Sequence, residues 1–451
     1  MKNYSISPTD QNAVELLKGN PLGRNDAVFR FLQLINSIDE SCSIALNGEW
    51  GSGKTIFIKQ IKLILDYSNP QSSLPHDLRE HIASMGKQIP ECANCSTVYY
   101  DAWANDDNDD PILSLVYATI ASKQSNFSSE NERSLLGLVG KILDAVTARP
   151  VSHILEQIKG ESPFAPIKTR ENIHALIREF LDELILERGN RLVVFVDELD
   201  RCRPAYAIQL LERIKHYFDD ERVTFVFSVN LTQLQHAVKS YYGHFFDATR
   251  YLDKFFDLRI SLPEIDYRRF IEYKFLFFSS GYIYDEICIR VAQYFSFTLR
   301  EVERYMRLIR IAAYKKSHNH REAFVPKQKA LQFGLLYFVP VMIGLSMSDM
   351  DAYSKFIAGE NFDILCKILS CMTAYTYQEW LGISKAHHAD IASAVMEKIK
   401  EVYNAVFVDT GNGYEATFET RIGEMSFTEQ TKREIMDIAT LLAPCAEYDF
   451  S

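Results

Sequence analysis

The octet GEWGSGKT at residues 48–55 fits the phosphate-binding loop pattern GxxxxGK[ST] at every fixed position. Gly48, Gly51 and Gly53 allow the backbone to wrap closely around phosphate oxygens and to aim successive amide N–H groups inward. Lys54 is then placed to contact the β and γ phosphates, and the Thr55 hydroxyl to bind Mg²⁺. The octet therefore predicts a nucleotide site, whose contacts are Gly48, Glu49, Trp50, Gly51, Ser52, Gly53, Lys54, Thr55 and Ile56.

A second candidate is the segment RLVVFVDELDR, residues 191–201, a hydrophobic strand that ends in carboxylates. Asp197 at the strand tip is expected to hold Mg²⁺, usually through water. Glu198 is expected to polarise the water that attacks the γ phosphate. Behind a phosphate loop, these acids predict a Mg²⁺-dependent nucleotide hydrolase. The alternative is a solvated strand end.

Short branched or aromatic segments alternate with helical ones through the first part of the chain, which favours a mostly parallel sheet covered by helices. The helix after the loop, TIFIKQIKLIL, is mostly apolar and follows a short buried strand. After Pro263 the strand pattern fades, and the chain reads mainly as amphipathic helices such as Ile391–Val406. The strands are expected at Ser43–Asn47, Thr97–Tyr100, Arg191–Val196 and Val223–Val229.

These patterns divide the chain into four parts. A helical lead-in covers residues 1–42, with a helix expected at Ala27–Ile38. The nucleotide-binding core covers 43–263 and carries a helical insert at about 105–185. A lid-like helical subdomain is expected at 264–325, and a helical region for partner recognition at 326–451.

Composition and charge restrict the class of protein. The chain has 451 residues, of which 47% are hydrophobic, so general disorder is excluded. Its net charge of −11 disfavours nucleic acid as a partner, although a local basic patch could still bind it. The N-terminal MKNYSISPTD lacks the apolar segment of a secretory leader, and the eight cysteines are scattered, so a cytoplasmic location is expected.

Three segments have competing interpretations. Residues 330–347 are apolar and almost reach bilayer length, but Pro340, Gly334 and Gly344 interrupt them, which favours a buried pair of core helices over a transmembrane segment. Cys92 and Cys95 form one CxxC with poorly spaced histidines nearby, which favours a surface loop over a zinc site. The acids at 106–110 lack the glycine and glutamate of a calcium loop, so Asp110 is expected to cap a helix beginning at Pro111.

Four segments together resemble the KAP family of P-loop NTPases: GEWGSGKT, YYDAWANDD at 99–107, FVDELDRCRP at 195–204, and RYLDKFFDLRISLP at 250–263. The resemblance covers roughly the first two thirds of the chain. It implies a P-loop ATPase of the additional-strand class, AAA+/STAND-like, followed by an all-α region. Several members carry transmembrane helices between the loop and the acidic strand, and no convincing insert of that kind is seen here. For such a member, the resemblance suggests a role in bacterial defence against phage or in signalling.

The resemblance also names further candidates. Asn230 matches a polar sensor of the γ phosphate, or alternatively caps a helix. Arg250 or Lys254 could reach a neighbouring subunit's phosphate, or pair with Asp253 or Asp257. Arg300 resembles an arginine that closes over bound nucleotide, with other arginines on the same stretch as alternatives.

Other residues of the resembling segments are expected to play structural roles. Asp200 and Arg201 are expected to form a structural ion pair. Trp103 is expected to pack in the core. Trp50 could stack near a nucleotide, contact a partner subunit or brace the loop.

Two functional classes remain. In the first, ATP hydrolysis drives the assembly of a homo-oligomer with an unidentified protein effector. In the second, the protein is a nucleotide-gated switch or scaffold with little hydrolysis. The intact set of Lys54, Thr55, Asp197 and Glu198 favours the first.

Overall fold

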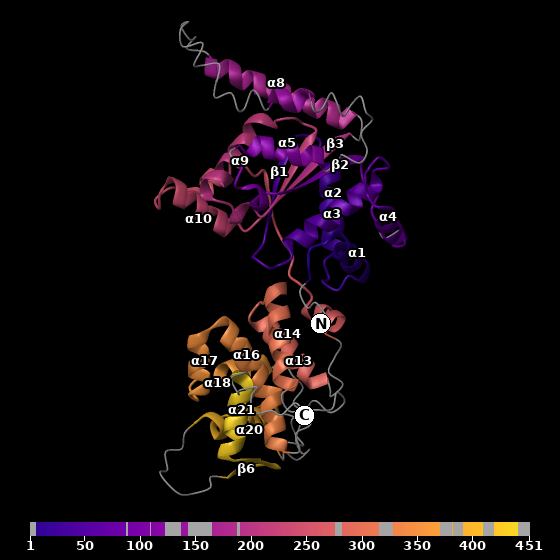
Figure 1. Ribbon diagram of the computed structural model, residues 1–451. Helices are drawn as coiled ribbons and strands as arrows, with labels where there is room; N and C mark the ends of the chain where they lie inside the picture. Colours follow the sequence, from indigo (N-terminus) through magenta and orange to yellow (C-terminus); the bar gives the residue numbers. More distant parts are fainter. Residues whose placement is uncertain are drawn as a thin grey trace, which may run out of the picture. The chain divides into compact units, whose positions relative to one another are not determined.

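The computed structural model describes residues 6–86, 89–108, 110–121, 137–142, 165–186, 190–275, 282–314, 328–369, 381, 391–408 and 419–440 (Figure 1). The chain forms two compact units. The first runs from Ile6 to Ile265, and the second begins at Asp266.

The centre of the first unit is a five-stranded sheet in which every described pair of neighbours is parallel. Its strand order is β2-β3-β4-β1-β5. The strand β4 therefore lies between β1, which leads into the phosphate loop, and β3, which ends in Asp197. This arrangement confirms the predicted additional-strand class of α/β fold. The strands are β1 (Cys42–Asn47), β2 (Cys95–Asp101), β3 (Arg191–Asp197), β4 (Val223–Val229) and β5 (Leu258–Ser261).

Alternating strand residues point into two hydrophobic cores, one on each face of the sheet. On one face, Ile44, Phe195 and Val226 pack with α2 (Asn25–Ser37) and α3 (Lys54–Ser68). On the other, Val194 and Phe227 belong to a core with helices from later in the chain. Figure 1 shows α5 and α9 across the sheet from α2 and α3. The helices of this second core are α5 (Pro111–Ala121), α8 (Ala165–Leu186), α9 (Pro204–Tyr217), α10 (Leu231–Tyr242) and α11 (Ala248–Leu252).

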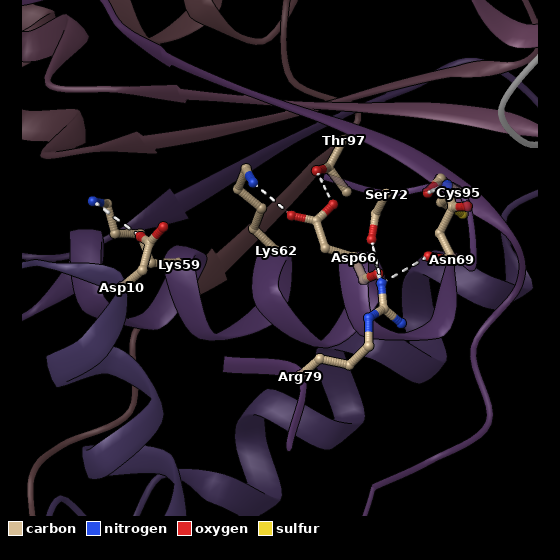
Figure 2. A network of polar contacts seen from close by, with 9 residues as sticks. All are labelled: Asp10, Lys59, Lys62, Asp66, Asn69, Ser72, Arg79, Cys95 and Thr97. Atoms are coloured by element: carbon tan, nitrogen blue, oxygen red, sulfur yellow. Dashed lines mark hydrogen bonds and ion pairs between the residues drawn. The ribbon is translucent and has the colours of Figure 1, made fainter. Parts of the chain in front are cut away.

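A polar network fixes the carboxyl end of α3, where it packs with α1 (Asp10–Gly19) and α4 (His76–Ala83) (Figure 2). The Arg79 guanidinium donates to the Ser72 hydroxyl at 2.7 Å and to the Asn69 carbonyl at 3.3 Å. Asp66 is buried and accepts from the Thr97 hydroxyl at 2.5 Å. The helix that begins at Lys54 is thus anchored at its other end to α4 and β2.

The described part of the second unit is mainly helical, as predicted, with one short antiparallel pair that the sequence did not indicate, β6 (Thr420–Ile422) and β7 (Met425–Phe427). Its helices are α12 (Tyr267–Lys274), α13 (Tyr282–Tyr294), α14 (Leu299–Tyr314), α15 (Lys329–Phe333), α16 (Val339–Ser348), α17 (Met350–Ile357), α18 (Phe362–Leu369), α20 (Ile391–Phe407) and α21 (Glu429–Thr440).

Residues 330–347 are buried as predicted, but the expected division into two helices is wrong, because α15 and α16 are joined by the π-helical turn η5 (Gly334–Phe338) into one helix. The wider turn ends two residues before Pro340, whose missing N–H would otherwise interrupt an α-helix. Of the described residues, Lys329–Ser348 forms a helix long and apolar enough to cross a membrane, and 83% of its apolar window is buried within the protein.

The structure also shows the contacts of the acidic segment at 106–110 and the position of Cys95. The Asp110 carboxylate accepts from the Ile112 N–H at 2.8 Å, which confirms the predicted cap of α5. Asp106 accepts from the Arg203 N–H at 3.0 Å, at the beginning of α9. Cys95 is buried as the first residue of β2, so it does not belong to a surface loop. Within the described ranges, no group of His, Cys, Asp and Glu is arranged to hold a metal ion by itself.

Candidate functional site

The phosphate loop joins β1 to α3 at the carboxyl edge of the sheet. Gly51 and Gly53 have φ values of 80° and 95°, which side-chain-bearing residues rarely adopt. A Cβ atom at Gly48 would lie 3.0 Å from Ser52 Oγ and 3.3 Å from Leu262 Cβ, so the loop could accommodate one only if its neighbours moved. The first residue of the loop is held to the end of β4, because the Gly48 N–H donates to the Val229 carbonyl at 3.1 Å.

Lys54 is the first residue of α3 and is 7% exposed. Its ammonium donates to the carbonyls of Gly48 at 2.7 Å and Glu49 at 3.1 Å. Burial lowers the pKa of Lys54, and the negative charges of Asp200, Glu198 and Asp197 oppose that shift. The lysine of the loop and the acids after β3 therefore belong to one site.

Asp197 ends β3 and is 1% exposed. Its carboxylate accepts from the Tyr99 phenol at 2.9 Å and from the Glu198 N–H at 3.0 Å. Burial raises the pKa of Asp197, whereas hydrogen bonds from neighbouring side chains, including the Thr55 and Tyr99 hydroxyls, lower it. The structure thus brings together the two residues predicted to hold Mg²⁺, Thr55 and Asp197.

Glu198 follows at the turn between β3 and the 3₁₀ helix η4 (Leu199–Arg201). Its φ of 59° places a non-glycine residue in the left-handed region, a conformation that costs energy and needs support from its surroundings. The Arg201 Nε lies 2.5 Å from Glu198 Oε2. Burial, together with the Asp197 charge, raises the pKa of Glu198 to about 7, although Arg201 opposes the shift.

The residues present fit a nucleoside triphosphate with Mg²⁺. Glycines in left-handed conformation form the loop, a buried ammonium lies at its base, and a buried carboxylate stands beside a threonine hydroxyl. Glu49 is exposed, and the Ile56 side chain is buried in the core. Any contact of Ile56 with a nucleotide therefore rests on its backbone.

Two residues at this site were missed by the sequence reasoning. Arg24 is 4% exposed and donates from Nη1 to the Ser52 carbonyl of the loop at 2.8 Å. Tyr99 donates to Asp197 from the neighbouring strand β2. Tyr99 lies within the segment YYDAWANDD, which could have drawn attention to it, whereas a single arginine before α2 carries no comparable pattern.

Asn230 lies between β4 and α10, and its Oδ1 accepts from the N–H groups of Thr232 at 3.1 Å and Gln233 at 3.2 Å. It is therefore a helix cap, and its role as a sensor stays a prediction. Arg250 and Lys254 are exposed on and after α11. Arg300, on α14, belongs to the second unit and is also exposed.

The two acids proposed as alternative partners of Arg250 and Lys254 make other contacts. Asp253 pairs with Arg259, and Asp257 accepts from the Ser43 N–H at 2.8 Å. The predicted roles of Arg250 and Lys254 toward a neighbouring subunit stay predictions.

Two structural expectations at this site are wrong. Trp103 is 53% exposed, because the 3₁₀ helix η2 (Trp103–Asn105) after β2 places it at the surface. The expected ion pair within the LDR segment is replaced by two separate contacts. Arg201 pairs with Glu198, and the Asp200 carboxylate accepts from the Trp50 indole N–H at 2.5 Å.

Comparison with known proteins gives one family. A model of the KAP family P-loop domain matches residues 27–315. No curated protein matches the sequence. Among solved structures, the chain is similar to the Aeropyrum pernix ORC2 protein in its ADPNP–ADP complexes, with 12% sequence identity, a TM-score of 0.27 and 93% of each chain covered.

Proposed function

Because the chain belongs to the KAP family of P-loop NTPases, we propose that it binds ATP with Mg²⁺ and hydrolyses the γ phosphate. The observation that carries the proposal is the convergence of Lys54, Thr55, Asp197 and Glu198 where β1 and β3 end. These groups come from two segments about 140 residues apart. Because β1 and β3 both run parallel to β4, the two segments follow strand ends on the same side of the sheet.

Each group has a chemical role in this proposal. The loop N–H groups and the Lys54 ammonium bind the phosphate oxygens. Thr55 and Asp197 would hold Mg²⁺, which neutralises phosphate charge when bound. Glu198 accepts a proton from the water whose oxygen bonds to the γ phosphorus. The bond from that phosphorus to the bridging oxygen breaks, and ADP and inorganic phosphate are released.

The test is ATP turnover by the purified protein, with Glu198→Gln as the variant. Loss of the proton acceptor should lower kcat by roughly 10²- to 10⁴-fold and leave ATP binding in place. A parent protein that binds ATP without turnover would contradict the hydrolase and support the nucleotide-gated switch. Equal kcat in parent and variant would show that Glu198 is not the proton acceptor.

We further propose that the nucleotide cycle controls assembly of a homo-oligomer with a protein effector in bacterial defence or signalling, within the cytoplasm. Family membership supports this proposal. Asn230 would contact the γ phosphate or the attacking water, Arg250 or Lys254 would act across a subunit boundary, and Arg300 would close over the nucleotide. The segments 264–325 and 326–451 would serve as lid and partner-recognition region.

The dependence of specific ATPase activity on protein concentration distinguishes a site shared between subunits from a site within one chain. If Arg250 or Lys254 acts on a neighbouring subunit, specific activity should fall on dilution, and Arg250→Ala or Lys254→Ala should lower its plateau. Size measurement with and without a non-hydrolysable ATP analogue should then show a nucleotide-dependent oligomer. Constant specific activity on dilution of a monomeric protein would contradict the oligomer.

A further inference from the structure

The phosphate loop contacts the LDR segment through Trp50. The indole N–H of Trp50 donates to Asp200 Oδ2 at 2.5 Å. The Trp50 side chain is 44% exposed, whereas Asp200 is 6% exposed. A residue between the loop glycines thus reaches a buried carboxylate beyond the end of β3.

Arg201 lies beside two indole rings. Its Cζ is 6.0 Å from the centroid of the Trp50 ring and 5.5 Å from that of Trp103. Both distances allow attraction between the guanidinium charge and the ring faces. The planar guanidinium is therefore restrained from the side of the phosphate loop and from the side of β2.

The same Arg201 holds Glu198. Its Nε is 2.5 Å from Glu198 Oε2, and its backbone N–H donates to the Glu198 carbonyl at 3.1 Å. These contacts tie both the side chain and the backbone of Glu198 to η4. They also support the left-handed conformation of Glu198, which needs such support to persist.

We propose that Trp50 is a positioning residue that links the phosphate loop to Glu198 through Asp200 and Arg201. Seating of phosphate oxygens in the loop then fixes Trp50, Trp50 fixes Arg201, and Arg201 fixes the Glu198 carboxylate. Of the three roles open to Trp50, this assigns the bracing one, with its N–H and its ring face both engaged by the protein. The inference rests on the ATPase activity proposed above.

The experiment compares Trp50→Phe, Arg201→Met and their double variant for kcat, KM and the Kd of a non-hydrolysable ATP analogue with Mg²⁺. Trp50→Phe keeps an aromatic ring and removes the donor to Asp200. We expect kcat to fall roughly tenfold and the Kd to change less than about threefold. Because the residues act in one chain of contacts, the double variant should match Arg201→Met instead of multiplying the two losses.

Arg201→Lys keeps the charge but not the planar fork, so kcat should recover only in part relative to Arg201→Met. It also serves as the partner of Trp50→Phe in the double variant if Arg201→Met fails to fold. A weaker Kd with unchanged kcat in Trp50→Phe would show that Trp50 contacts the nucleotide. That result, or losses that multiply in the double variant, would overturn the link.

A second readout does not depend on turnover. The chain has three tryptophans, at positions 50, 103 and 380, so a Trp103→Phe/Trp380→Phe protein reports Trp50 alone. We expect its emission to shift when the analogue binds, and Arg201→Met to abolish most of that shift. If the parent binds ATP without turnover, the hydrolase proposal fails, and this readout decides the link. No shift, or one that Arg201→Met leaves intact, would overturn it.

Discussion

Tyr99 controls the environment of the buried Asp197 carboxylate at the scale of single residues. Its phenol donates to Asp197 at 2.9 Å, and its ring lies 5.1 Å from the Lys59 ammonium. Burial raises the pKa of Tyr99, and the Asp197 charge raises it further, so the phenol stays protonated and remains a donor. The hydrogen bond restricts rotation of a carboxylate that is proposed to hold Mg²⁺.

Tyr99→Phe should therefore weaken metal use more than it weakens the fold. We expect the Mg²⁺ concentration for half-maximal ATP turnover to rise roughly tenfold, within the range for groups that orient metal ligands. The ring beside Lys59 is retained. Tyr117→Phe, at an exposed position on α5, is the matched control. An unchanged Mg²⁺ requirement in Tyr99→Phe would show that the phenol does not orient Asp197.

At the scale of elements, α3 connects the nucleotide site to a structural anchor. It begins at Lys54 and ends at Ser68, where Arg79 donates to the Tyr67 carbonyl at 2.8 Å. The same guanidinium donates to the Asn69 carbonyl at 3.3 Å (Figure 2). Carbonyls at a helix end lack intrahelical partners, so this guanidinium satisfies groups that would otherwise lose their hydrogen bonds.

Arg79→Met should destabilise the first unit by about 1–3 kcal/mol, because partly buried carbonyls lose charged donors. Urea denaturation checks this value. Arg30→Met, on the exposed side of α2, is the matched control and should change stability by less than about 0.5 kcal/mol. Equal stability of Arg79→Met and the parent would mean that solvent replaces the network without loss.

A second prediction at this scale concerns the close packing of the helix from Lys329 to Ser348 against α13. A Cβ atom at Gly344 of α16 would overlap Val291 Cγ1 of α13 and lie 3.1 Å from Phe295 Cε2. Gly344→Ala should destabilise the second unit by about 1–3 kcal/mol through overpacking, measured by denaturation.

Gly140→Ala is the control for Gly344→Ala, because Gly140 is also helical and a Cβ atom there would meet nothing within 4 Å. Helix propensity should make that variant neutral or more stable by up to about 1 kcal/mol. If Gly344→Ala changed the free energy of unfolding no more than Gly140→Ala does, the close approach of α13 and α16 would be contradicted.

The limits of a strand could be predicted from sequence where the strand has a distinct hydrophobic pattern of its own. All seven residues of β4 are buried, and the mostly apolar, branched and aromatic run Val223–Val229 gives its limits. By contrast, β5 is an edge strand of four mostly exposed residues, and its apolar–polar alternation, LRIS, is too short to indicate a strand. The exposed Trp103 and the contact of Arg24 with the loop depend on local turns and distant packing, which residue type does not encode.

At the scale of the whole molecule, the division at Asp266 separates a unit built on the sheet from a mainly helical one. The strand pattern of the sequence fades after Pro263 and amphipathic helices follow, which indicates a boundary in this region. The strand order could be expected only through family resemblance, since strand pairing is not local in sequence. The lid and partner-recognition roles of 264–325 and 326–451 stay predictions.

The central claim is that the phosphate loop and the acids at the end of β3, Asp197 and Glu198, bind one nucleotide. Calorimetric titration of the purified protein with a non-hydrolysable ATP analogue and Mg²⁺ tests it most directly, comparing the parent with Lys54→Ala and with the control Lys62→Ala on the same helix. We predict one site in the parent, affinity unchanged in Lys62→Ala, and affinity lowered at least about tenfold in Lys54→Ala, since a charged hydrogen bond is lost. Equal affinity in parent and Lys54→Ala, or no binding by the parent, would contradict the account.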